Sequence, residues 1–468
     1  MISTNVYLLI DAGLLTFFLL LNGFYAFILL LGFPVLIRKF KETGSEELNE
    51  LLKSDHVPPI SIIIPAHNER EIIHETISSV YHLDYPYVSL IVVNDGSTDG
   101  TLEVLIERYE LSKVPPAIPA HLKTQKVRAI YRSKKLPNFI VVDKEKESQE
   151  DALNAGLNAC TTPYYLATDA DAMIEPDVLR KLARTLLTRP QTMGLGGALR
   201  VGNGCIIEDG LVKQVRLGKS YLTKMQTLEY LRGFFFGRLG WNMLGGPYNL
   251  SGAFNLYEKK TAIEVGGYGK QVPASDLDLT IRMHGKVHEL KQHYNIEYVP
   301  DACIWLEVPQ GYKDLSLQRQ RWSCSLLDVC AKYKYMFVNP KYGRIGFLYL
   351  PYLILGEGIG PIVEAFAYLY VPFTFFMGVL NTRFLFLFLI IAWGFTSLLT
   401  FISIAMEQTT FKKYLSTSDV LKLIGLTFIE NFGYRQMSIW WRIRGFFRFF
   451  SKNRYYREHP TRHSYKEE

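Results

Sequence analysis

Apolar positions are distributed along this chain in two kinds of pattern, long uninterrupted runs and short alternating segments. Residues 13–36 (GLLTFFLLLNGFYAFILLLGFPVL) carry no charge and are long enough to span a bilayer. The run follows a polar start and lacks a small-residue cleavage site, so we expect an anchor and not a cleaved signal peptide. Arg38, Lys39 and Lys41 follow directly, which predicts that this end of the helix lies in the cytosol.

A second apolar block extends from Phe347 to Ala405, and a weaker apolar stretch covers residues 419–440. The tail after it is basic (Arg442, Arg444, Arg448, Lys452, Arg454, Arg457), so we expect it in the cytosol too. An even number of crossings must then separate the tail from the region that follows the first apolar run. We expect four, with residues 346–380 as a hairpin bent at Gly358–Pro361. Two crossings with re-entrant segments satisfy the same rule.

Three acidic residues interrupt these apolar stretches. Glu357 and Glu364 are seven positions apart and therefore share one helix face, and Glu430 lies in the last stretch. Carboxylates are costly in lipid. They are expected either to line a polar conduit or to lie near the membrane interface.

Between the apolar blocks, residues 56–335 alternate strand and helix patterns. Ile60–Ile64 is a β-branched run ended by a proline and predicts a buried strand, and residues 69–80 have helical spacing. Residues 88–93 predict the next strand and residues 98–108 the next helix. This order is the plan of an open α/β sheet, which binds ligands outside the carboxyl ends of its strands.

Polar residues follow these strands. Glu69 and Asp95 come after the first two, although Asp95-Gly96-Ser97 is also compatible with a simple turn and helix cap. Tyr164–Thr168 predicts a third strand, after which come Asp169 and Asp171. Two carboxylates one residue apart at a strand end suit a divalent cation, which a nucleotide-sugar enzyme needs to neutralise the departing diphosphate.

Two later segments carry further candidate chemistry. Residues 273–279 open a helix in which Ser275 or Asp276 could be a cap, or Asp276 a general base. In the run Gln318–Trp322, two arginines beside a tryptophan suit phosphate binding and sugar stacking. Taken alone, that run favours a membrane-surface helix with snorkelling arginines.

The composition agrees with a membrane protein. Of 468 residues, 48% are apolar, and the net charge of +7 is largely at the membrane flanks, which indicates attraction to anionic headgroups and not nucleic-acid binding. Five scattered cysteines form no CxxC pair, so we expect reduced structural thiols and no structural zinc site.

Taken in order, these runs resemble the membrane-embedded family-2 glycosyltransferases, which include cellulose, chitin, hyaluronan and poly-N-acetylglucosamine synthases. The resemblance covers roughly residues 57–330. The elements that carry it are Pro65–Glu69, Asn94–Asp99, Asp151–Gly156, Asp169–Asp171, Ser251–Phe254, Asp276 and Gln318–Trp322.

The resemblance implies a GT-A-type α/β nucleotide-sugar-binding domain, with an open, mostly parallel sheet and helices, between an N-terminal transmembrane helix and a C-terminal α-helical transmembrane block. We expect these parts: anchor 1–40, linker 41–55, cytosolic domain with interface helices 56–335, two to four crossings within 336–445, and basic tail 446–468.

The resemblance also implies residue roles. Uridine and nucleotide-sugar binding would fall to Ala66, Glu69, Asp95, Asp151 and Asp169. A Mg²⁺ or Mn²⁺ ion would be held by Asp169 and Asp171, and Asp276 would be the base that deprotonates the acceptor hydroxyl. The diphosphate and acceptor would be bound by Ser251, Gly252, Gln318, Arg319 and Arg321, with Trp322 stacking on the acceptor sugar.

The chain departs from the family pattern at three places, one of them Cys324-Ser325 after Trp322, where small or basic residues with glycine are more usual. Ser148-Gln149-Glu150 stands where Gly-Lys-Ala is usual, so a lysine near the donor is missing, and Lys144 or Lys146 is the candidate to replace it. Ser275 stands before Asp276 where a glutamate is usual. These changes bear on donor affinity and on the pKa of the base.

The function that the resemblance implies is inverting transfer of a hexose or N-acetylhexosamine from a UDP-sugar to a growing β-linked polysaccharide, processive and coupled to translocation. The expected location is the plasma or inner membrane, with several crossings and a cytoplasmic catalytic domain. Expected partners are the UDP-sugar, a glycan acceptor, the bilayer and an accessory export or co-polymerase protein, with no nucleic acid. The alternatives are transfer of one sugar to a lipid or glycolipid, and a non-catalytic binding subunit.

Overall fold

The computed structural model describes residues 4–43, 50, 52, 57–115, 118–233, 237–269, 274–290, 293–414 and 416–451. Several expectations fall outside these residues: most of the linker 41–55, the start of the predicted helix at Pro273, and the end of the basic tail at Lys452, Arg454 and Arg457.

The chain divides into two units. The helical unit contains the described parts of Met1–Phe33, Lys219–Gly240 and Pro309–Thr461, and the sheet unit contains those of Pro34–Gly218 and Trp241–Val308. The expected boundary near residue 335 is not where the chain divides, because helix α11 (Tyr312–Lys332) belongs to the helical unit.

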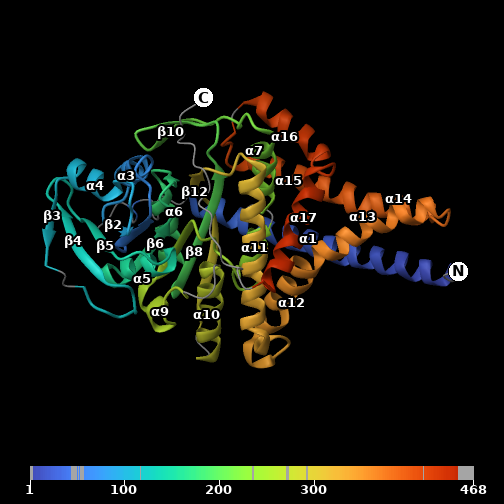
Figure 1. The fold of residues 1–468 in the computed structure, drawn as a ribbon, viewed down its shortest axis with the longest axis horizontal. Helices are drawn as coiled ribbons and strands as arrows, with labels where there is room; N and C mark the ends of the chain where they lie inside the picture. Colours follow the sequence, from blue (N-terminus) through green and yellow to red (C-terminus); the bar gives the residue numbers. More distant parts are fainter. Residues whose placement is uncertain are drawn as a thin grey trace. The chain divides into compact units, whose positions relative to one another are not determined.

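A ten-stranded mixed sheet forms the centre of the sheet unit, in the order β3-β4-β5-β2-β1-β6-β11-β8-β12-β7 (Figure 1). The strands are β1 (Ile60–Ala66), β2 (Val88–Asp95), β3 (Leu111–Val114), β4 (Val127–Ser133), β5 (Phe139–Lys144), β6 (Tyr164–Thr168), β7 (Met173–Ile174), β8 (Thr192–Val201), β11 (Phe254–Glu258) and β12 (Asn295–Leu306). A separate pair contains β9 (Ile206–Glu208) and β10 (Leu211–Gln214). The neighbours β5, β2, β1 and β6 run parallel, whereas β11 runs antiparallel to β6. The expected GT-A-type α/β sheet is thus confirmed.

The helices of the sheet unit are α3 (Ile73–Tyr81), α4 (Thr101–Arg108), α5 (Gln149–Ala159), α6 (Val178–Thr188), α9 (Lys259–Glu264) and α10 (Ser275–Glu289), with the 3₁₀ turn η2 (Gly240–Leu244) at the unit boundary. Helix α5 begins where the Ser148 hydroxyl accepts a hydrogen bond from the Asp151 amide at 3.3 Å. It lies directly on β1, because a side chain at Gly156 would overlap Ile63. Close packing therefore fixes α5 against the strands whose ends form the site.

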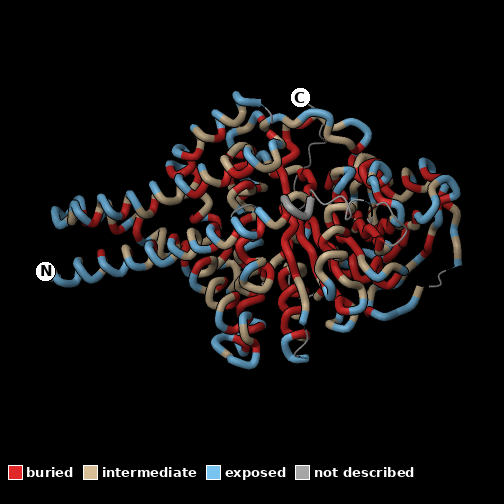
Figure 2. The backbone as a smooth tube through the Cα atoms, turned by 180° about the vertical axis from the view of Figure 1, so that it is seen from behind, coloured by how far each residue is buried: buried red, intermediate tan, exposed pale blue. Residues whose placement is uncertain are grey.

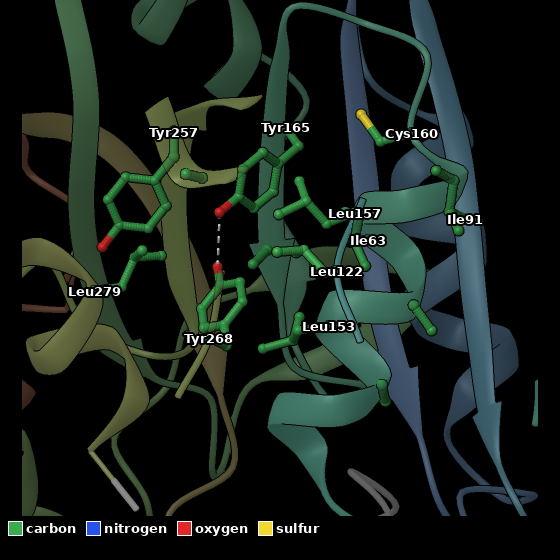
Figure 3. Close-up of a cluster of buried hydrophobic side chains, with 14 of the residues drawn as sticks. Ile63, Ile91, Leu122, Leu153, Leu157, Cys160, Tyr165, Tyr257, Tyr268 and Leu279 are labelled. Atoms are coloured by element: carbon green, nitrogen blue, oxygen red, sulfur yellow. Dashed lines mark hydrogen bonds between the residues drawn. The ribbon is translucent and has the colours of Figure 1, made fainter. Parts of the chain in front are cut away.

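Apolar side chains from α5, β6, β11 and α10 fill the core beside the sheet (Figure 3). Leu157, Tyr165, Tyr257 and Leu279 are fully buried, and burial of each such side chain contributes about 1.5–3 kcal/mol. The Tyr165 hydroxyl donates to Tyr268 at 3.3 Å, which satisfies it within the apolar cluster. This core holds the site-bearing ends of α5 and α10 in fixed positions.

Long helices make up the helical unit. They are α1 (Thr4–Thr43, whose last turns lie in the sheet unit), α7 (Tyr221–Leu231), α8 (Gly237–Leu239), α11 (Tyr312–Lys332), α12 (Leu350–Tyr352), α13 (Gly360–Phe376), α14 (Thr382–Leu389), α15 (Phe395–Thr410), α16 (Thr417–Ile429) and α17 (Tyr434–Phe449). The 3₁₀ turns η3 (Lys334–Met336) and η4 (Pro340–Tyr342) follow α11. The π-helical turns η5 (Ile345–Tyr349) and η6 (Leu353–Ile359) join α12 and α13 into one longer helix. The π-helical turn η7 (Ile390–Gly394) joins α14 and α15 into another.

Three helices in the described part of the chain are long and apolar enough to cross a membrane: Asn5–Lys39, Ile345–Phe376 and Thr382–Thr410. Exposed residues are frequent along α1 next to the N label of Figure 2. The hairpin expected at Gly358–Pro361 is wrong, because the helix continues through these residues. Pro361 lies in the first turn of α13, directly after the π-helical turn η6, where a missing N–H is tolerated.

The basic residues after the first apolar run are bound within the sheet unit. Arg38 Nη2 donates to Glu297 Oε2 at 3.4 Å, and Lys39 Nζ donates to Thr185 Oγ1 at 2.7 Å. Glu297 is also paired with Arg189. Arg38 and Lys39, which were expected to set the membrane orientation of α1, therefore also attach the end of this helix to β12 and α6.

Candidate active site

Four parallel strands end at the same edge of the sheet. Their last residues are Ala66, Asp95, Lys144 and Thr168. Strand β11 begins at this edge, since Phe254 pairs with Thr168. The loops that follow β1, β2, β5 and β6, and the loop that precedes β11, therefore gather in one place, where open α/β sheets bind ligands.

The loops after β1 and β2 are bonded to each other. Asn68, whose φ is +59°, accepts a hydrogen bond from the Thr98 amide at 2.8 Å and donates its own amide to Ser97 Oγ at 3.1 Å. The His67 ring lies 2.9 Å from the Asp95 carbonyl oxygen. These bonds fix the two loops as one surface.

The first three residues of the expected uridine site lie on that surface. Ala66 is buried and pairs with Asn94 at the end of the parallel ladder. Glu69 is half-buried, and its amide donates to Thr101 Oγ1 at 3.0 Å. Ala66, Glu69 and Asp95 are thus brought together as the resemblance implies.

A buried ammonium group lies behind Asp95. Lys144 is fully buried, and its Nζ contacts Asp95 Oδ1 and, at 2.8 Å, Asp151 Oδ2. The Glu147 amide also donates to Asp95 Oδ1 at 3.1 Å. The Asp151 carboxylate, fully buried, accepts further bonds from the Gln125 amide at 3.1 and 3.2 Å. Asp151 therefore lies behind Lys144, which links it to Asp95, and the expected contact of Asp151 with a donor stays a prediction.

Gln149 occupies the position of the missing lysine and contacts the acidic pair. Its Nε2 donates to Asp169 Oδ1 at 2.9 Å from the first turn of α5. The Thr76 hydroxyl donates to the Ala170 carbonyl at 2.6 Å and fixes the turn between the two aspartates. A neutral amide thus replaces the expected ammonium, since Lys144 is engaged with two carboxylates and Lys146 lies 2.7 Å from the His67 ring.

The two carboxylates at this turn suit a hard divalent cation that takes its remaining ligands from a bound molecule and from water. Asp169 and Asp171 are both half-buried. Within the described residues, no group of three or more His, Cys, Asp or Glu side chains could hold a metal ion. Two carboxylates suit Mg²⁺ or Mn²⁺, whose remaining positions are commonly filled by phosphate oxygens and water.

Asp276 and Asp278 have different environments at the start of α10. A Cβ on Gly252 would lie 3.8 Å from the Asp276 carboxyl carbon, so the half-exposed Asp276 faces the loop before β11. In that loop Ser251 has a φ of +90°. Asp278 is fully buried, and Arg282 donates to it at 2.7 and 2.9 Å. The geometry leaves Asp276 as the carboxylate available at the site.

The run Gln318–Trp322 lies on α11 of the helical unit. Trp322 is 44% exposed, and Gln318 and Arg321 are half-buried. Arg319 is only 8% exposed, and its Nη2 donates to Glu229 Oε2 of α7 at 2.5 Å. The expected diphosphate contact of Arg319 does not fit this buried pairing, whereas Gln318, Arg321 and Trp322 have surface that a ligand could reach.

Two family models match the chain. The model described as glycosyl transferase family 2 matches residues 61–238. The model described as glycosyl transferase family group 2 matches residues 166–406, about half of the chain. The chain is a family-2 glycosyltransferase. The resemblance inferred from its motifs is confirmed.

Curated relatives of this glycosyltransferase include the poly-beta-1,6-N-acetyl-D-glucosamine synthase of Staphylococcus epidermidis, 28% identical over 276 residues, which are 58% of this chain and 56% of the relative. The enzyme of the same name from Staphylococcus aureus (strain COL) is 26% identical over 270 residues, 58% of this chain and 55% of the relative. The match therefore spans about half the length of each relative.

Solved structures similar to this glycosyltransferase include a Pyrobaculum calidifontis mannosyltransferase in complex with GDP-Man and Mn²⁺, with 15% identity, a TM-score of 0.49, and coverage of 91% of this chain and 99% of the other. Residues 1–349 of S. aureus TarS in complex with UDP-GlcNAc are 15% identical, with a TM-score of 0.39 and coverage of 81% and 92%. No feature of either structure is carried over to this chain.

Sequence reasoning missed several supporting residues of this glycosyltransferase. The Arg282–Asp278 pair could have been predicted from the sequence, because the two residues are four positions apart on one helix face. The contact between Glu229 and Tyr434 could not, because they lie on helices far apart in the sequence and meet only in the folded helical unit.

Proposed function

We propose that this glycosyltransferase moves a hexose or N-acetylhexosamine from a UDP-sugar to a growing β-linked polysaccharide, with inversion at the anomeric carbon, and passes the product across the membrane as it grows. The observation that carries the proposal is the arrangement at one sheet edge: Asp95 held by Lys144, the Asp169–Asp171 turn, and Asp276 facing Gly252. The names of the staphylococcal relatives support a polysaccharide product built from N-acetylglucosamine.

Asp95 is the candidate uracil acceptor. Lys144 and the Glu147 amide both bond to its Oδ1, and no described residue bonds to Oδ2. Oδ2 is therefore available to accept the uracil N–H. The fixed Lys144 holds the carboxylate in one orientation, so little ordering remains for the ligand to impose.

Asp276 is the proposed base. It removes the proton of the acceptor hydroxyl as that oxygen attacks the anomeric carbon, and the bond to the diphosphate breaks with its electron pair leaving on UDP. A divalent ion held by Asp169 and Asp171 would neutralise the charge that develops on the diphosphate. Gln149 keeps Asp169 Oδ1 hydrogen-bonded and so orients the other oxygen of that carboxylate.

The helical unit supports a location in the plasma or inner membrane, with the sheet unit on the cytoplasmic side. Three candidate spans and basic residues at their flanks are the supporting features. An accessory export or co-polymerase protein remains part of the proposal as an expected partner.

The test is a donor screen with the full chain in nanodiscs. UDP-glucose, UDP-galactose, UDP-N-acetylglucosamine and UDP-N-acetylgalactosamine are supplied with Mg²⁺ or Mn²⁺, and mass spectrometry sizes and identifies the product. A long β-linked polymer from one donor is the expected result. Addition of a single sugar would overturn processive synthesis, and an absence of transfer and of UDP release with every donor would overturn the enzymatic proposal.

A further inference from the structure

One face of the Trp322 ring is covered from within its own helix. The guanidinium carbon of Arg319 lies 4.4 Å from the centre of the ring, within the range of a favourable cation–π contact. Arg319 is buried and Trp322 is 44% exposed. The ring therefore has one face against a fixed cation, and its exposed surface is left for a ligand.

Two other helices hold that cation. Glu229 of α7 accepts a hydrogen bond from Arg319 Nη2 at 2.5 Å, and the same oxygen accepts the Tyr434 hydroxyl of α17 at 3.0 Å. The helices α7, α11 and α17 lie side by side in the helical unit (Figure 1). The back of Trp322 is thus connected through Arg319 to a carboxylate that is itself fixed from α17.

Close packing along α11 supports the same geometry. A Cβ on Gly445 of α17 would lie 2.6 Å from the Gln320 carbonyl oxygen, which no side chain permits. Beside this point Ser323 Oγ donates to the Arg442 carbonyl at 3.0 Å. Helix α11 is therefore held against α17 at Gln320, between Arg319 and Trp322, and at Ser323 directly after them, which restricts its rotation about its own axis.

The protonation states suit this arrangement. Burial on its own lowers the pKa of the Arg319 guanidinium, but Glu229 together with Tyr434 and Tyr230 more than offsets this, and the pKa lies above its ordinary value. Burial and the charge of Glu229 both raise the pKa of the Tyr434 hydroxyl. Arg319 stays cationic and Tyr434 stays a donor at physiological pH.

We propose that Glu229, Arg319 and Tyr434 are positioning residues that fix the Trp322 ring, so that the acceptor sugar stacks on its open face in one register. This inference rests on the proposed function, since it takes Trp322 as the acceptor platform. It gives Arg319 a role behind the platform and leaves the diphosphate to Gln318 and Arg321. A ring free to turn would hold the acceptor sugar in variable orientations, and misplacement by about 1 Å can cost 10²-fold in rate.

The experiment reads the ring directly by ¹⁹F NMR. The full chain is labelled with 5-fluorotryptophan in nanodiscs, and the resonance of Trp322, one of six tryptophans, is assigned by its loss in Trp322→Phe. Glu229→Gln and the milder Tyr434→Phe should shift or broaden that resonance. Glu364→Gln, which breaks a comparable interhelical pair with Arg435, should leave it in place.

Enzyme assays supply the second readout. Glu229→Gln should lower polymer formation by about 10-fold relative to UDP-sugar hydrolysis and raise the acceptor KM, with the UDP-sugar KM changed less than about 2-fold. Arg319→Lys, which keeps the charge, should recover part of the loss that Arg319→Met causes. UDP binding by calorimetry verifies that each variant is folded.

The outcomes separate this inference from the proposed function. An unchanged Trp322 resonance in both Glu229→Gln and Tyr434→Phe overturns the positioning role, whatever the wild-type enzyme makes. Equal loss of hydrolysis and polymer formation overturns it too, because the defect would then lie at the donor. If the wild type makes no polymer, the proposed function fails, and the ¹⁹F result still decides whether these residues position the ring.

Discussion

The site-bearing edge of the sheet unit and the helical unit of this glycosyltransferase hold charge in different ways. At the sheet edge one cation serves two carboxylates, since Lys144 pairs with both Asp95 and Asp151, and the neutral amide of Gln149 donates to Asp169. In the helical unit, four buried or half-buried glutamates, from α7, η6, α13 and the end of α16, each pair with their own arginine. These pairs are Glu229–Arg319, Glu357–Arg442, Glu364–Arg435 and Glu430–Arg232.

The difference separates a site from a scaffold. Several carboxylates gathered at the sheet edge suit a further cation or donor group, which is what a metal–diphosphate ligand brings. Matched pairs join α11 to α7, and α17 to η6 and α13. The expectation that Glu357 and Glu364 share one helix face is consistent with both of them pairing with α17, and whether they also line a conduit stays a prediction.

The largest effect should come from removing the cation site. Asp171→Ala takes away one of two carboxylate ligands and should lower transfer by about 10³-fold, because several kcal/mol of charge stabilisation depend on the ion. Mn²⁺ binding measured by electron paramagnetic resonance should weaken in parallel. The control is Asp177→Ala, a nearby aspartate 53% exposed and paired with Lys181. Full activity of Asp171→Ala at low metal would refute the metal assignment.

A stability test examines the matched pairs of the helical unit. Glu364→Gln leaves Arg435 without its charge partner and should cost roughly 3 kcal/mol, the scale for a broken buried pair. Replacing both residues by leucine should be near neutral, since no unpaired charge remains. Thermal unfolding in nanodiscs measures both. If the double variant is as unstable as the single one, the pair does more than neutralise charge.

The next test compares the two aspartates of α10. Asp276→Asn keeps the shape but cannot take the proton, so transfer should fall by roughly 10²-fold with UDP binding near normal. Asp278→Asn breaks the buried pair with Arg282 and should lower the melting temperature instead. A loss of transfer confined to Asp278→Asn would mean that the base was assigned to the wrong residue.

Periodic patterns predicted much of the sheet unit. The β-branched runs gave β1 and β2 to within two residues, because buried parallel strands read as continuous apolar segments. The separation of Asp276 from Asp278 followed from helix geometry. The site-bearing loops were predictable because strand ends meet at one edge.

The helical unit was less predictable because its decisive contacts are between helices. Arg319 and Arg321 are equivalent in the sequence, and only Glu229 and Tyr434 on other helices decide which of them is buried. The continuous helix through Gly358–Pro361 depends on a π-helical turn, which has no sequence signature as clear as a proline. Positive flanking residues were assigned to topology, although Arg38 also pairs with Glu297.

A smaller effect is expected at Lys144, the buried cation behind the proposed uridine site. Lys144→Met leaves Asp95 and Asp151 without their shared partner and should weaken UDP binding by about 10-fold, the scale of one charge-assisted hydrogen bond. Lys146→Met is the matched control, because that lysine is exposed and contacts His67. Calorimetry with UDP measures both, and equal weakening would show that only local positive charge matters.

The smallest expected effect is the order in which the buried cysteines of the two units become reactive as the protein unfolds. All five are free and buried, and burial raises the pKa of Cys205 in the sheet unit to about 11 and of Cys330 in the helical unit to about 12. Few thiolates are therefore present at pH 8, and iodoacetamide should modify none of these cysteines in the native protein. In rising urea the sheet-unit thiols should react before Cys324 and Cys330, because interhelical ion pairs and the surrounding lipid hold the helices. Mass spectrometry of the labelled peptides gives the order, and earlier labelling of Cys330 would mean that the interhelical pairs do not make the helical unit the more resistant of the two.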